Sequence, residues 1–139
     1  MKKRTEQEEM IIKARVSGKS FCELSDLEKR VAVDQMMFNA AAISGCGLPQ
    51  TEMFASIIAE QICLYLTEFG HDVFTEAEFL LALQLNAHGR IKNPAGEDLT
   101  QVTFIGNQIN VSFLAKIFNN YATIRNNLDG MIKNKIDGY

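Results

Sequence analysis

Two histidines and a nearby group of carboxylates are the residues whose types could support metal binding or proton transfer. His71 lies beside Asp72 and shortly before Glu76 and Glu78, and His88 follows further along the chain. Neither the spacing nor the flanking residues match a zinc motif. Each histidine instead adjoins a glycine that would end a helix, where the helix dipole favours a positive ring. We therefore expect both histidines to cap helices or lie on the surface, and the carboxylates to stabilise the start of a helix.

Phosphate binding and nucleophilic catalysis are not indicated either. Gly45 and Gly47 are not followed by the Lys and Ser or Thr of a phosphate-binding loop. Gly18-Lys19-Ser20 resembles the end of such a loop, but the upstream glycine and strand are missing. The serines have no histidine at a suggestive spacing. The sequence therefore predicts a protein that is not an enzyme, with no catalytic residue, metal, cofactor or small-molecule substrate.

The last predicted helix carries a polar, asparagine-rich face that is the best candidate for binding. Asn and Arg side chains suit base edges and phosphates, Lys suits phosphates, and a tyrosine ring offers a stacking surface. An ordinary solvated face that is rich in Asn explains the same pattern, so both interpretations stay open. We predict that the following residues contact nucleic acid or a partner: Lys116, Asn119, Asn120, Tyr121, Arg125, Lys133 and Lys135.

The helices that position these side chains are predicted from apolar residues at spacings of three and four. The predicted segments are residues 5–16, 26–44, 50–69, 76–88 and 110–128, with a short extension after residue 130. Ser25 with Glu28 and Thr75 with Glu78 form capping boxes at the start of two of them. The fold class is therefore all-α, a bundle of about five helices.

Apolar residues on two of these helices predict which sides are buried. Val31 and Phe38 belong to a broad apolar side, so we expect the helix of residues 26–44 to be buried on most sides. If the protein oligomerises, residues 36–42 would lie partly at the interface. On the helix of residues 50–69, Phe54 and Ile57 are expected in the core.

The two irregular parts of the chain leave alternatives open. Asn93-Pro94-Ala95-Gly96 is a strong turn signal, and residues 101–105 have strand character. A short β-hairpin or an extended loop near residues 100–109 is thus expected. We interpret residues 1–139 as a single helical domain in which residues 1–20 form a frayed N-terminal helix or an arm.

Charge and composition narrow the class of protein further. The net charge is +3 over residues 1–19, −8 over residues 20–104 and +2 over residues 105–139, without the dense basic stripe of a typical nucleic-acid binder. The three cysteines form no disulfide framework. No apolar run approaches the roughly 20 residues of a membrane span, and no secretory signal is present. We therefore expect a cytoplasmic protein that does not enter a membrane.

The C-terminal half resembles small helical proteins encoded by bacteriophages and mobile elements. The resemblance rests on FTEAEFLLAL at residues 74–83, NAHG at 86–89 and INVSFLAKIFNNY at 109–121. Some of these proteins are replication accessory or helicase-loader-like proteins, and no catalytic residue is carried over. The resemblance implies a non-enzymatic accessory protein, in the host cytoplasm, that contacts DNA or a replication protein through its last helix. The alternative is a protein–protein interaction or structural module, as a homo-oligomer or virion component.

Overall fold

The residues that the structure describes form five α-helices, as the sequence predicts. The computed structural model describes residues 4–89, 92, 97, 102 and 108–137, with side chains as far as Leu128. The helices are α1 (Glu6–Arg15), α2 (Asp26–Ser44), α3 (Glu52–Glu68), α4 (Glu76–Ala87) and α5 (Val111–Asp137), with short 3-10 helices η1 (Phe21–Glu23) and η2 (His71–Val73). Isolated β-bridges join Ser20 to Thr75 and Gly47 to Gln108, and the described residues form no sheet. Most of the expected hairpin or loop near residues 100–109 lies outside the described residues.

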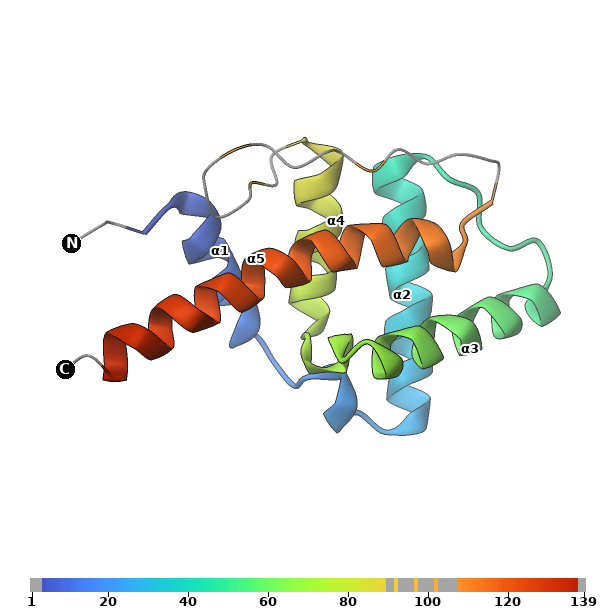
Figure 1. Cartoon of the computed structure of the whole chain (residues 1–139). Coiled ribbons are helices and arrows are strands. Elements are labelled where there is room, and N and C mark those ends of the chain that lie inside the picture. Colours follow the sequence, from blue (N-terminus) through green and yellow to red (C-terminus); the bar gives the residue numbers. More distant parts are fainter. Residues whose placement is uncertain (1–3, 90–91, 93–96, 98–101, 103–107, 138–139) are drawn as a thin grey trace.

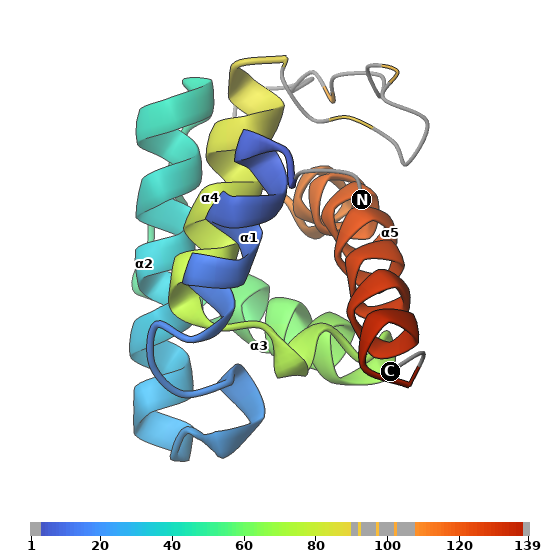
Figure 2. The same ribbon diagram turned by 90° about the vertical axis from the view of Figure 1, so that its left-hand side faces the viewer.

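Helix α4 occupies the centre of the bundle. It lies between α1 and α2 and contacts both, while α5 runs across it (Figure 1). The turned view places α2, α4 and α1 side by side, with α5 on the other side of α4 and α3 beneath (Figure 2). Helix α3 contacts both α2 and α5, whereas α1 packs against α4.

Local side-chain contacts explain where several helices begin and end. Ser25 Oγ accepts from the Glu28 amide at 3.2 Å, and the Glu28 carboxylate accepts from the Ser25 amide at 3.0 Å. This capping box and the one at Thr75, with distances of 3.2 and 3.1 Å, are both as predicted. Gly45 closes α2 with φ of 74°, a left-handed conformation that suits glycine. Gly130, by contrast, does not interrupt α5, which continues to Asp137.

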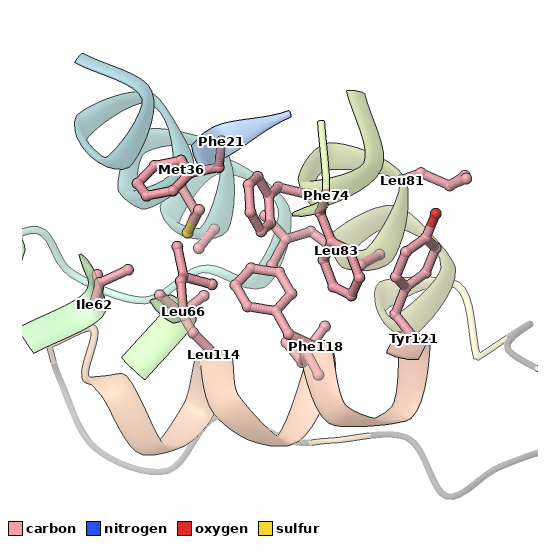
Figure 3. Close-up of a cluster of buried hydrophobic side chains, with 14 of the residues drawn as sticks. Phe21, Met36, Ile62, Leu66, Phe74, Leu81, Leu83, Leu114, Phe118 and Tyr121 are labelled. Carbon is pink, nitrogen blue, oxygen red and sulfur yellow. The ribbon is translucent and has the colours of Figure 1, made fainter. Parts of the chain in front are cut away.

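The core lies where α2, α3, α4 and α5 meet. Ile62 and Leu66 of α3 and Leu114 and Phe118 of α5 point toward the same cluster, with Leu83 of α4 (Figure 3). Their burial, together with that of the other fully enclosed side chains, is the main stabilising contribution to the fold. Six further large side chains are almost completely buried in this core: Tyr121, Phe21, Phe74, Ile11, Ile109 and Ile117.

The N-terminal helix is packed and not frayed. Ile11 of α1 is fully buried, and α1 packs against α4. Thr75 Oγ1 donates to the Ala14 carbonyl at 2.7 Å, and the same carbonyl accepts from the Ser17 amide at 3.2 Å. A residue 61 positions away in the sequence therefore holds α1 in place.

Candidate interaction surfaces

Tyr121, which was expected to offer a stacking surface, is instead completely buried. Its side chain projects from α5 toward α4 (Figure 3), and its hydroxyl donates to Glu78 Oε2 at 2.7 Å. Burial and the neighbouring Glu78 carboxylate raise the pKa of Tyr121 well above its ordinary value. The prediction of a stacking contact at Tyr121 is therefore wrong, because the ring belongs to the apolar seam of α5.

Arg125 is also buried, in an ion pair that joins α5 to α4. Its Nε atom lies 2.6 Å from Glu78 Oε2, and the guanidinium lies 5.1 Å from the centre of the Phe74 ring. Glu78 is 0% exposed and Arg125 is 9% exposed. Arg125 is thus held in the interior, so the prediction that it contacts nucleic acid or a partner is wrong. Glu78 stabilises the start of α4, as expected, and its carboxylate also forms the ion pair with Arg125.

Asn119 joins α5 to the end of α3. Its Oδ1 atom accepts from the Tyr65 hydroxyl at 2.8 Å and lies 2.9 Å from His71 Nε2. Burial raises the pKa of Tyr65 to about 12. The His71 ring is buried and stacked on Phe74, with ring centres 5.0 Å apart. The surface interpretation is therefore wrong for His71, whereas His88 is exposed at the end of α4, as expected.

The remaining predicted contact residues leave a smaller polar face on α5. Lys116 is exposed and Asn120 is half-buried. Lys133 and Lys135 belong to α5, but their side chains lie outside the described residues. The exposed side chains between residues 111 and 128 are those of Ser112, Lys116, Asn119, Thr123, Asn126 and Asn127, and none is a carboxylate.

Neither a metal centre nor a membrane-spanning helix is found in the parts of the chain that the structure describes. Within those residues, no group of three or more His, Cys, Asp or Glu side chains is arranged to hold a metal ion. Likewise, none of the described helices combines the length and apolar character needed to cross a bilayer.

Helix α3 is apolar on two opposite sides, and only one of them is covered. Its inner side carries the buried Ile62 and Leu66. Its outer side exposes Met53, Ile57 and Leu64, whose exposed fractions are 74%, 50% and 55%. These three residues, the outer row of α3, have spacings of four and seven, which place them within about 40° of one another around a helix. Phe54, expected in the core with Ile57, is exposed beside this row.

Helix α2 repeats the same arrangement. Leu27, Val31 and Phe38 are exposed and have the same spacings of four and seven, and we call them the outer row of α2. The expectation that α2 is buried on most sides is therefore wrong: its covered side consists of Ala32, Val33, Met36, Met37 and Ala40. Isolated exposed apolar residues are ordinary in proteins. Two rows with helical spacing are more informative, because aligned apolar side chains form a surface that water solvates poorly.

Comparisons of the chain with protein-family models, with curated proteins and with solved structures gave no match.

Proposed function

We propose that this protein is a protein-binding helical module whose contact surface is the outer row of α3, with the outer row of α2 as a second apolar surface. The observation that carries the proposal is the exposure of Met53, Ile57 and Leu64 on the side of α3 that faces away from the core. Helical partners are commonly recognised through apolar anchors at spacings of three, four and seven. Burial of such side chains stabilises a complex by about 25 cal/mol for each Å² of apolar surface removed from water.

Among the described residues, the most enclosed charged side chain has its partners inside the fold, so it is not available to bind a ligand. The most enclosed charged group, Glu78, is bound by Arg125, Tyr121 and the Thr75 amide. The charge of Glu78 is therefore paired in the interior. The exposed apolar side chains of the two outer rows, by contrast, have no role in the packing of the core.

Photo-crosslinking at the outer row of α3 tests this proposal. We expect a photoreactive residue in place of Ile57 to form a discrete adduct in the natural host, because this side chain would lie inside the interface. The same residue in place of Gln84, an exposed position on α4, is the matched control. Mass spectrometry identifies the partner in the adduct. We then expect the purified partner to bind the Ile57→Asp variant at least ten-fold more weakly than it binds the unsubstituted protein. Equal crosslinking at positions 57 and 84, or unchanged affinity of Ile57→Asp, would contradict the proposal.

A second candidate function is contact with nucleic acid through α5, and one observation favours it. The exposed face of residues 111–128 presents hydroxyl and amide groups around Lys116 with no carboxylate to repel phosphate. The resemblance to replication accessory proteins of phages and mobile elements points in the same direction. With Tyr121 and Arg125 in the core, Lys116 is the principal cation of the described part of this face.

Titration with single- and double-stranded DNA tests this second candidate. We expect binding at micromolar protein that weakens steeply as salt is raised, because phosphate contacts release counterions. Lys116→Gln should weaken binding and reduce the salt slope by about one unit. Lys29→Gln on α2 is the control for net charge. Binding that is insensitive to salt, or equal losses in the two variants, would argue against contact through α5.

A further inference from the structure

We propose that the partner presents an amphipathic helix bearing Lys or Arg to the outer row of α3. This inference rests on the proposed function and adds the chemistry of the partner. The charge around the row is acidic, since α3 carries Glu52, Glu60 and Glu68 and no basic residue.

The acidic character extends well beyond α3. Residues 31–89 contain seven carboxylates and no Lys or Arg. Two arginines neutralise part of this charge from outside the segment. Arg30 pairs with Asp34 at 3.0 Å and with Glu52 at 3.2 Å, and Arg125 pairs with Glu78.

Glu60 and Glu68 are the carboxylates next to the row that no ion pair between described residues neutralises. Both are exposed on α3. Glu60 lies between Ile57 and Leu64 along the row, and Glu68 follows Leu64 by one helical turn. A complementary surface would therefore place cations at the edge of an apolar contact, as charges flank the apolar seam of paired helices.

The same charges argue against the other occupants of this row. Two copies of α3 packed together would place Glu60 and Glu68 beside equivalent carboxylates, and like charges in an interface are destabilising. An anionic bilayer surface would likewise be repelled, because it attracts basic segments. A cationic amphipathic helix satisfies both the apolar row and the carboxylates.

Binding of three synthetic peptides provides the test. The first is an 18-residue amphipathic Leu/Lys helix, the second has Glu at every Lys position, and the third has the Leu/Lys composition in scrambled order. We expect the Leu/Lys helix to bind at least ten-fold more tightly than either of the others in fluorescence anisotropy at physiological salt. Equal binding of the Leu/Lys and Leu/Glu helices, or no binding of the Leu/Lys helix, would overturn the proposal.

A charge swap on α3 locates the contact. In the Glu60→Lys/Glu68→Lys variant, we expect the preference to reverse, so that the Leu/Glu helix binds more tightly than the Leu/Lys helix. Glu6→Lys/Glu9→Lys changes the net charge equally at exposed positions on α1 and should keep the original preference. Reversal in this control, or its absence in the α3 variant, would overturn the proposed location.

Two further measurements separate this inference from the proposed function. If the segment crosslinked at position 57 lacks Lys and Arg, the protein-binding function stands and the basic-helix proposal fails. If sedimentation shows a dimer that Ile57→Asp dissociates, a second copy covers the row and the basic-helix proposal fails again. If position 57 forms no specific adduct, the protein-binding function itself fails.

Discussion

Replacing Arg125 by Met is expected to destabilise the protein by about 3–5 kcal/mol, because it leaves a buried carboxylate without its cation. Glu78 is fully enclosed, and Arg125 Nε lies 2.6 Å from its Oε2 atom. The remaining partners, the Tyr121 hydroxyl and the Thr75 amide, are neutral donors. Since domains of this size are stable by about 5–15 kcal/mol, the loss takes a large share of the total. Urea unfolding, with the midpoint compared at constant slope, measures it.

Arg30→Met is the matched control for this substitution. Arg30 pairs with Asp34 and Glu52, but its side chain is one-third exposed, so we expect a cost of no more than about 1 kcal/mol. Adding Glu78→Gln to Arg125→Met should recover part of the stability, because the amide removes the unpaired charge and keeps polar partners for Tyr121 and Thr75. Equal costs at positions 30 and 125, or no recovery in the double variant, would show that the buried pair has no special role.

Features that depend on neighbouring residues could be predicted from the sequence. The capping boxes at Ser25 and Thr75 each require only two side chains and two amides from residues three positions apart, and the structure confirms both. Phe74 and Phe79 are also placed as a hydrophobic staple, with ring centres 5.7 Å apart. Gly45 ends α2 for the equally local reason that it adopts a left-handed conformation. The beginnings of α2 and α4 and the end of α2 therefore follow from short-range chemistry, whereas the continuation of α5 past Gly130 does not.

The choice of buried side could not be predicted for α3. Apolar residues occupy both of its faces at helical spacing, so periodicity alone cannot distinguish the core side, with Ile62 and Leu66, from the outer row. Which side is covered depends on where α2 and α5 lie, and that is a long-range property. For the same reason α1 could not be recognised as packed, because the hydrogen bond from Thr75 to Ala14 joins distant segments.

The burial of Arg125 did leave a signal in the sequence. Leu114, Phe118, Tyr121, Arg125 and Leu128 follow spacings of four, three, four and three, which is the period of a single apolar seam. Arg125 therefore stands at a core position, and a charged residue there requires a buried partner. The residue type suggested a surface contact, whereas the register indicated the interior, and the structure agrees with the register.

The substitution Phe74→Ala is expected to cost about 3–5 kcal/mol, because it removes a large ring from the centre of the aromatic core. Phe74 is 2% exposed and contacts the rings of Phe79, His71 and Tyr121 with centres 5.0 to 5.7 Å apart. Its ring also lies under the Arg125 guanidinium. The cavity would therefore weaken the packing of η2, α4 and α5 together, and urea or thermal unfolding would measure the loss.

Phe38→Ala makes the same chemical change in the outer row of α2. Phe38 is 58% exposed, so the lost burial corresponds to no more than about 1 kcal/mol. Equal costs at positions 38 and 74 would mean that the outer row of α2 is covered within the fold, which would remove its role as a second contact surface. We expect Phe38→Ala instead to cost little stability and to weaken binding of the crosslinked partner. That result would show that the inner side of α2 stabilises the fold, whereas its outer side contributes to binding.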